Sequence, residues 1–300
     1  MTTNLPPVPT RKATVLDYIG AGCAFAALFV LRRLPFQVVS WLGGGLARTI
    51  GPWLKPSRTA RKNLAAVFPD MAPAELSRTI TQVWDNMGRT AFEFAVMDQL
   101  LRAPGRQRVE IHGEENLDAA VQTQKPILFF GAHMGNWELL PVSTQLVGLS
   151  AHSFYRAPNN PLLQKLFTNR ASRGEMIPKG TRGARRALAL LKQNQHLGIL
   201  VDQKLNDGIA VPFFGRDAMT GTALAEFALR FDAPMVPVRC ERLPGARFKL
   251  TFLPALEVPP NDDKKAAVRH IMSRVNALLE NWIRATPGQW LWLHNRWPKA

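Results

Sequence analysis

One short apolar run constrains the fold of this chain more than any other feature. Residues Pro126-Ile-Leu-Phe-Phe130 lie between Lys125 and Gly131 without a charged side chain, and such a run predicts a strand that is buried in a parallel sheet. Similar runs recur at 196–201, 235–238 and 248–252, and helical patterns lie between them at 135–146, 181–191 and 222–230. This alternation predicts an α/β fold, with a mostly parallel sheet flanked by helices, that begins near Val109 within a domain spanning residues 56–300.

The last residues of the chain carry a different pattern. Trp290-Leu-Trp-Leu-His294 alternates aromatic and aliphatic side chains, which predicts a final strand. The tryptophans of this region, Trp290, Trp292 and Trp297, suit either the core or an interface.

Residues 1–55 form an apolar and basic segment ahead of the α/β domain. Two uncharged stretches, 18–31 and 34–47, flank Arg32-Arg33, and each is shorter than the ~20 residues that cross a bilayer. A pair of core helices, a tilted span over 13–31 and attachment to one leaflet all fit this pattern. A signal peptide does not, because basic residues rather than small ones follow the first stretch. We favour a membrane-associated helical segment, since the flanking basic residues suit anionic headgroups and Trp41 and Trp53 suit the interface.

The net charge of +16 is concentrated in two segments. Residues 1–62 carry nine basic residues and one acid, and residues 154–192 carry the same numbers. Such an excess is typical of nucleic-acid binders and of proteins on anionic membranes. Cys23 and Cys240 lie far apart and belong to no CxxC pattern, so neither a disulfide framework nor a metal site is indicated.

The segment that can carry chemistry follows the buried strand directly. It reads Gly131-Ala-His-Met-Gly-Asn-Trp-Glu138, and α/β proteins place functional groups at the carboxyl ends of such strands. On one continuous helix Glu138 would lie about 140° away from His133, so the two act together only if the chain breaks at Gly135 before a helix starts.

In that geometry Glu138 holds one imidazole nitrogen of His133, and the other nitrogen takes a proton from a substrate hydroxyl. The N–H groups of Gly135 and Asn136 would stabilise a developing oxyanion. From the spacing alone, a histidine with a purely structural hydrogen bond is the commoner explanation.

Several blocks, in order, resemble one family. The segment 131–138 resembles the HxxxxD/E block of the glycerolipid acyltransferase superfamily. The other blocks resemble its branch of bacterial lipid A biosynthesis (lauroyl/myristoyl) acyltransferases; they are Tyr155-Arg156 with Asn159-Asn160-Pro161, Asp202-Gln203 with Asp207-Gly208-Ile209, Val211-Pro-Phe-Phe-Gly215, and the closing segment Pro287–Trp297. The likeness covers roughly residues 55–297.

The resemblance implies roles for individual residues. His133 would be the general base, and Glu138 the acid that orients it. The substrate would be bound by Arg156, Asn159, Asn160, an arginine at position Arg170 or Arg173, and Asp202, which matches the acid of the third block. Guanidinium groups in this basic segment suit the phosphates of a glycolipid.

The resemblance also implies a reaction. An acyl-carrier-protein thioester would donate a fatty acyl chain to a hydroxyl of a lipid A precursor, a glycolipid, at the cytoplasmic face of the inner membrane. No cofactor is expected, because the thioester supplies the driving force. A lysophospholipid, another glycolipid or an aminolipid is an alternative acceptor that the His/Glu pair does not distinguish. A third possibility is a non-catalytic module that binds membranes or nucleic acid, but this would not explain the His/Glu pair. We therefore expect membrane lipids as partners and no nucleic acid.

Overall fold

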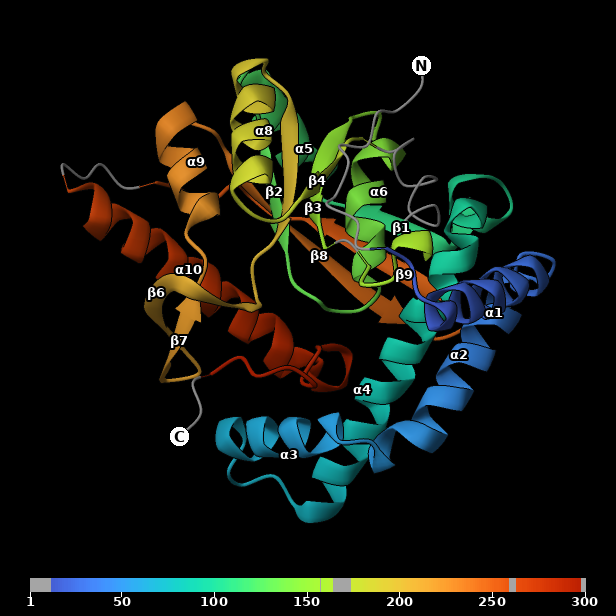
Figure 1. Cartoon of the computed structure of the whole chain (residues 1–300). Coiled ribbons are helices and arrows are strands. Elements are labelled where there is room, and N and C mark those ends of the chain that lie inside the picture. The colour runs from blue at the N-terminus through green and yellow to red at the C-terminus, as the bar shows by residue number, and fades with distance from the viewer. Residues whose placement is uncertain (1–11, 157, 164–173, 259–262, 298–300) are drawn as a thin grey trace.

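A mostly parallel sheet forms the centre of the molecule. The computed structural model describes residues 12–156, 158–163, 174–258 and 263–297 (Figure 1). The seven-stranded sheet has the order β1-β9-β8-β2-β5-β3-β4, with bounds β1 Val109–His112, β2 Leu128–Gly131, β3 Ala151–Tyr155, β4 Met176–Pro178, β5 His196–Leu200, β8 Met235–Leu243 and β9 Arg247–Phe252. Neighbouring strands are parallel except β8 and β9, which confirms the predicted fold class.

Helices cover both faces of this sheet because side chains alternate along each strand. Leu128 and Phe130 of β2 pack on one face with α8, α9 and α10, whereas Phe129 packs on the opposite face with α5. The bounds of these helices and of α6 are α5 Glu114–Gln122, α6 Leu140–Leu146, α8 Thr181–Lys192, α9 Ala223–Phe231 and α10 Lys264–Ala285.

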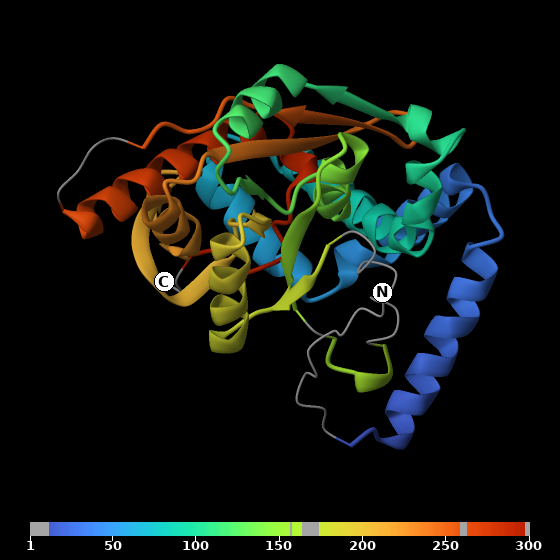
Figure 2. The same ribbon diagram turned by 90° about the horizontal axis from the view of Figure 1, so that it is seen from above.

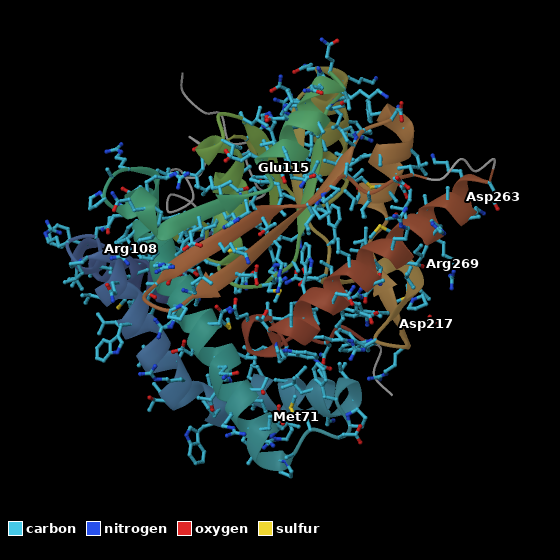
Figure 3. All side chains as sticks on the ribbon, turned by 180° about the vertical axis from the view of Figure 1, so that it is seen from behind. Met71, Arg108, Glu115, Asp217, Asp263 and Arg269 are labelled. Carbon is cyan, nitrogen blue, oxygen red and sulfur yellow. The ribbon has the colours of Figure 1, made fainter. Side chains whose placement is uncertain are left out.

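A β-hairpin that the sequence pattern did not indicate packs against α10. Strands β6 (Lys204–Phe213) and β7 (Arg216–Thr220) pair antiparallel. Phe214 and Gly215 connect them with φ angles of 53° and 69°, the geometry of a two-residue hairpin turn. Helix α10, which Figure 3 shows from behind with Arg269 labelled, holds this hairpin: Arg269 Nη1 donates to the Ala210 carbonyl at 2.8 Å and Asn276 Nδ2 to the Pro212 carbonyl at 3.0 Å.

The predicted final strand is wrong. The chain forms the short 3-10 helix η6 (Pro287–Gln289) and then turns into the core, where Trp290, Trp292 and Trp297 are buried. The physical reason is that the indole N–H groups find partners inside the protein: that of Trp292 donates to the Pro287 carbonyl at 2.8 Å, and that of Trp297 to the Phe213 carbonyl at 3.1 Å. These tryptophans are therefore core residues, not interface residues.

The N-terminal helices form a separate layer beside the sheet (Figure 1). They are α1 Val15–Leu31, α2 Phe36–Ile50, η1 Gly51–Trp53, α3 Pro56–Val67, α4 Pro73–Glu93, η2 Phe94–Leu101 and η3 Gly105–Arg108. Helix α2 crosses α4 at Gly43 and Gly88, where a Cβ on Gly88 would lie 2.2 Å from the Gly43 carbonyl oxygen. The backbones therefore touch at this crossing. The domain boundary near residue 55 stays a prediction.

Helix α1 lies at the edge of the molecule (Figure 2) and covers little of it. Asp17 and Ala21 are buried, and Ala24, Leu28 and Leu31 are half-buried, so one stripe at a spacing of three or four residues faces the protein. The rest of the helix exposes large apolar side chains, namely Val15, Leu16, Tyr18, Ile19, Phe25, Phe29 and Val30. In the described part of the chain, no helix combines the length and the apolar character that crossing a bilayer requires.

The α2–α4 crossing yields a stability prediction. Gly88→Ala should lower the free energy of unfolding by about 1–3 kcal/mol, because the added methyl group forces the two backbones apart. Gly45→Ala in α2 is the matched control: its Cβ would meet nothing closer than Arg48 Nη2 at 4.0 Å, and alanine favours helix. Denaturant unfolding measures both variants; equal stability of the two would contradict the close crossing.

Candidate active site

The parallel pairing of β2 and β5 brings His133 to Asp202. Gly131 at the end of β2 pairs with Leu200 at the end of β5, and each functional residue lies two positions beyond. The pair therefore continues the register past the carboxyl edge of the sheet, where α/β proteins bind their ligands. His133 Nδ1 lies 2.7 Å from Asp202 Oδ1, and the His133 backbone N–H donates to Asp202 Oδ2 at 2.9 Å.

Asp202 is a fully buried carboxylate with three hydrogen bonds. The third comes from Trp290, whose indole N–H donates to Oδ2 at 2.7 Å. Burial raises the pKa of the Asp202 carboxyl, but the positive potential and hydrogen bonds of His133, together with His294, outweigh it and hold this pKa well below its ordinary value. The charged carboxylate assigns the proton of the neutral imidazole to Nδ1, and Nε2 is then the nitrogen with a free lone pair.

From the sequence we expected the Glu138 carboxylate to accept a hydrogen bond from an imidazole nitrogen of His133. In the structure the hydrogen-bond partner of His133 Nδ1 is Asp202 instead. The signal that was missed is the strand register: both residues follow the ends of neighbouring parallel strands by two positions. The expected break between His133 and Glu138 is confirmed. Gly135 has a φ of 56°, and Glu138 lies in the 3-10 helix η4 (Trp137–Leu139) that starts after it.

Gly135 and Asn136 stabilise the turn between His133 and η4. The Gly135 N–H donates to the Gln289 carbonyl at 3.1 Å, so this group, which we expected to face an oxyanion, already has a partner inside the protein. A Cβ at Gly135 would lie 2.4 Å from the Cys240 carbonyl oxygen, which leaves room only for glycine. Asn136 is fully buried, and its Oδ1 accepts the Glu138 N–H at 3.1 Å as the cap of η4.

His133 and Glu138 line the same cavity, which has a volume of about 340 Å³. Its walls come from β2, η4, α6, β3, β4, β5 and β8 and are mainly apolar, with Phe129, Leu140, Phe154, Met176, Leu200 and Val238 among them. Its polar lining includes Arg156, Lys179 and Gln203 besides the two residues of the motif. A long apolar group thus fits beside an imidazole and a few charges.

The remaining predicted binding residues are dispersed. Arg156 lines the cavity, and Asn159 is exposed. Asn160 Nδ2 donates to the Asp17 carbonyl of α1 at 2.8 Å, and its Oδ1 accepts the Leu162 N–H at 3.0 Å, so this asparagine joins the N-terminal helix to the loop after β3. Arg170 and Arg173 lie outside the described residues.

The buried carboxylate yields a pH-dependent stability prediction. Asp202→Asn should lower the free energy of unfolding at pH 7 by about 3–5 kcal/mol, because an amide cannot accept all three hydrogen bonds. A carboxyl whose pKa is lowered by folding stabilises the protein above its unfolded pKa of about 3.9 and loses that effect as the pH falls towards the folded value. The difference between wild type and variant should therefore shrink below about pH 4.

Asp217→Asn is the control for this experiment, since Asp217 is exposed on β7, and it should change stability by less than about 0.5 kcal/mol. Urea unfolding between pH 3 and pH 7 measures all three proteins. Two results would contradict the proposed stabilising role of the ionised Asp202 carboxylate. One is a loss of unfolding free energy in Asp202→Asn no larger than that of the control, and the other is a loss of the same size at pH 3 and pH 7.

Comparisons with known proteins identify the family of this chain. The family model described as bacterial lipid A biosynthesis acyltransferase matches residues 10–299. The lipid A biosynthesis lauroyltransferase of Escherichia coli (strain K12) is 26% identical, covering 98% of this chain and 96% of the relative. The lipid A biosynthesis palmitoleoyltransferase of the same strain and a lipid A biosynthesis acyltransferase of Shigella flexneri are each 24% identical, covering 94% of this chain and 90% of the relative. This chain is an acyltransferase and belongs to the bacterial lipid A biosynthesis acyltransferase family.

Proposed function

We propose that this enzyme moves a fatty acyl chain from an acyl-carrier-protein thioester to a hydroxyl group of a lipid A precursor, with His133 as the general base. One observation carries the proposal: His133 lines an apolar cavity, and its Nδ1 is held by the buried Asp202 at 2.7 Å. Such an imidazole presents Nε2 to a substrate. The cavity suits the hydrocarbon chain of the donor, which places the thioester carbonyl beside the base.

The reaction balances without a further group. The acceptor oxygen attacks the thioester carbonyl carbon while His133 Nε2 takes the hydroxyl proton. The carbon–sulfur bond then breaks, and the thiolate of the carrier takes that proton, which leaves an ester and a free thiol. General-base assistance of this kind contributes about 10²–10⁴-fold to the rate.

Glu138 remains in the proposal as a catalytic residue. It lines the cavity together with His133 and is fixed at the start of η4 by the hydrogen bond from its N–H to Asn136 Oδ1 at 3.1 Å. Because Asp202 already engages Nδ1, we assign to Glu138 the electrostatic stabilisation of the imidazolium that forms when His133 takes the proton. In this arrangement Asp202 orients the base, and Glu138 favours its charged form.

Basic residues at the cavity support an anionic donor and acceptor. Arg156 and Lys179 line it and are exposed, and Arg182 and Arg185 lie on the exposed side of α8. Carrier proteins are acidic, and lipid A precursors carry phosphates, so both would be attracted to this surface.

The N-terminal helices supply the proposed membrane contact. Most of α1 is apolar and exposed, and Trp41, Leu46, Ile50 and Trp53 extend the apolar surface along α2 and η1. Exposed apolar surface of this extent, with Arg32, Arg33 and Arg48 beside it, fits insertion into one leaflet of an anionic membrane. We propose that this leaflet is the cytoplasmic one of the inner membrane, where an acyl-carrier protein is available.

Acyl transfer by detergent-solubilised protein tests the proposed reaction. Wild type, His133→Ala and the control His270→Ala, an exposed histidine on α10, receive acyl-carrier-protein thioesters of several chain lengths together with a tetraacylated lipid A precursor. His133→Ala should lower the rate by at least about 10²-fold, because the base is lost, and the control should match wild type.

A second acceptor makes the outcome decisive. Transfer to a lysophospholipid but not to the glycolipid would support the proposed catalytic residues and show that the proposed acceptor is wrong. Equal rates for wild type and His133→Ala would remove His133 from the mechanism.

Flotation with anionic lipid vesicles tests the membrane contact. Leu16→Glu with Ile19→Glu places two charges on the exposed side of α1, where the side chains are 79% and 58% exposed. The variant should bind vesicles at least about tenfold more weakly than wild type, since two exposed apolar side chains that insert into the leaflet are replaced by charged ones. Val121→Glu is the control, because Val121 is an exposed apolar residue on α5; unchanged binding of the α1 variant would exclude this surface.

A further inference from the structure

The segment between His133 and Glu138 rests on a buried ion pair. Arg242 lies near the end of β8 and Glu93 at the end of α4, and their side chains are 9% and 0% exposed. Arg242 Nη1 lies 2.5 Å from Glu93 Oε1, and Nη2 lies 2.9 Å from Oε2. The guanidinium and the carboxylate therefore face one another with two parallel hydrogen bonds, the geometry that arginine favours.

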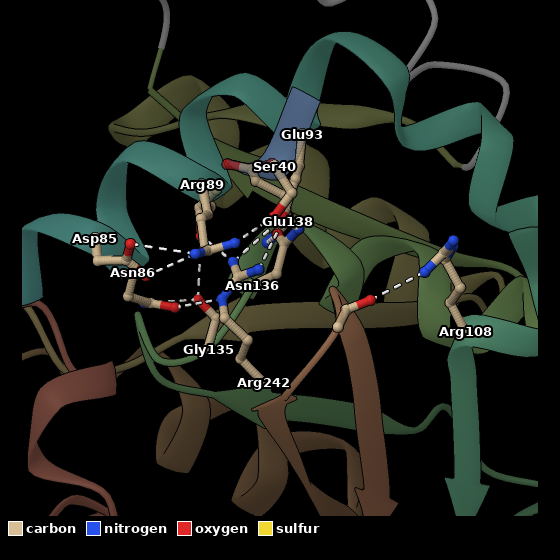
Figure 4. Close-up of polar contacts among 12 residues, drawn as sticks. Ser40, Asp85, Asn86, Arg89, Glu93, Arg108, Gly135, Asn136, Glu138 and Arg242 are labelled. Atoms are coloured by element: carbon tan, nitrogen blue, oxygen red, sulfur yellow. Dashed lines mark hydrogen bonds and ion pairs between the residues drawn. The ribbon is translucent and has the colours of Figure 1, made fainter. Parts of the chain in front are cut away.

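Glu93 is linked to the motif through Asn136. Asn136 Nδ2 donates to Glu93 Oε2 at 2.7 Å, and Asn136 Oδ1 accepts the Glu138 N–H at 3.1 Å. Because both ends of one buried amide are engaged, the position of the Glu93 carboxylate sets the position of the Asn136 side chain. That side chain in turn sets the first turn of η4, which carries Glu138 (Figure 4).

Arg242 is linked to the motif through two residues of α4. Its Nε donates to Asn86 Oδ1 at 2.7 Å, and its Nη2 donates to Thr90 Oγ1 at 3.1 Å. Asn86 Nδ2 and Thr90 Oγ1 both donate to the Gly135 carbonyl, at 2.9 Å and 3.2 Å. The side chains that accept hydrogen bonds from this guanidinium, those of Asn86, Thr90 and Glu93, thus contact the segment between His133 and Glu138 directly or through Asn136.

Stability alone is a weak explanation for such a network. Removing charges from water costs free energy that a buried ion pair rarely recovers in full, so apolar side chains of similar size stabilise a fold about as well. A network in which each member has its partners does, however, define one geometry closely. Here the geometry that it defines is that of the turn at Gly135 and of the first residues of η4.

We propose that Glu93 and Arg242 are positioning residues of the acyltransferase reaction, which hold the Gly135–Glu138 segment so that Glu138 faces the cavity beside His133. The inference rests on the catalytic role proposed for that segment. Neither residue is among those that line the cavity, so their effect on catalysis passes through Asn136 and Gly135.

The other side of α4 offers a matched control. Asp85 pairs with Arg89 of the same helix at 2.5 Å and with Arg48 of α2 at 3.1 Å. Arg89 Nη1 also donates to Ser40 Oγ at 3.2 Å, so this second network fastens α4 to α2 and not to the motif. Asp85→Asn removes a charge from the same helix as Glu93→Gln without touching the Gly135–Glu138 segment.

Steady-state acyl transfer by the full-length protein tests the proposal first. Glu93→Gln should lower kcat by about 10- to 100-fold through misplacement of the motif, with KM for the thioester changed by less than about threefold. Asp85→Asn should keep kcat within about twofold of wild type. If Glu93→Gln does not fold, Thr90→Val replaces it, since it keeps every charge; the loss of its hydrogen bonds should lower kcat by about two- to tenfold.

A double-mutant cycle separates positioning from general damage. Because Glu93 and Asn136 share one of the hydrogen bonds that hold the motif, the variant with both Glu93→Gln and Asn136→Ala should lose less activity than the product of the two single losses. Losses that multiply would show that the two residues act independently and would overturn the proposal. So would a kcat of wild-type size in Glu93→Gln or Thr90→Val, or an equal loss in Asp85→Asn.

Hydrogen exchange gives a result that does not depend on activity. Amides of the peptide 132–140 should exchange faster in Glu93→Gln than in wild type, whereas Asp85→Asn should leave this peptide unchanged. Exchange of the peptide that is unaltered in Glu93→Gln would contradict the positioning role. If wild type itself transfers no acyl group, the proposed function fails, and the exchange measurement still decides whether Glu93 holds the motif.

Discussion

The hydrogen bond between His133 and the buried Asp202 is the interaction on which the rest of the site depends. It requires β2 and β5 to be parallel neighbours in one register, because each residue lies two positions beyond its strand. It also requires the C-terminal segment to fold back into the core, since the Trp290 indole N–H donates to the same carboxylate at 2.7 Å. Residues from three distant parts of the chain therefore fix the orientation of one imidazole ring, with Nδ1 on the carboxylate and Nε2 directed away from it.

Two helical elements connect this site to the remainder of the molecule. Helix α4 contacts the turn at Gly135 with one side, through Asn86 and Thr90, and α2 with the other, where Gly43 and Gly88 meet. Helix α1 lies beside the loop after β3, which it reaches through the hydrogen bond from Asn160 to the Asp17 carbonyl. The surface that we assign to the membrane and the segment that we assign to catalysis are thus connected through the contacts of α2 with α4 and through this hydrogen bond.

Much of the fold could be predicted because its central strands are short apolar runs with a clear pattern. The run ending at Phe130 became β2, and the break at Gly135 follows from glycine's tolerance of a positive φ. The partner of the His133 Nδ1 atom could not be predicted in the same way, because spacing along the chain says nothing about which strand lies beside β2. The Glu93–Arg242 pair was missed for the same reason: the two residues are 149 positions apart, and only the packing of α4 against β8 joins them. The strand expected at Trp290 failed because alternation also occurs in a turn whose indoles are buried.

The most direct test of the account is single-turnover acyl transfer by the Asp202→Asn variant, with binding of the thioester measured in parallel. If Asp202 fixes the proton of His133 on Nδ1, the chemical step should slow by about 10²–10⁴-fold while thioester binding is retained. A chemical step as fast as that of wild type would contradict the account, because His133 would then act as a base without the carboxylate that the structure places beside it.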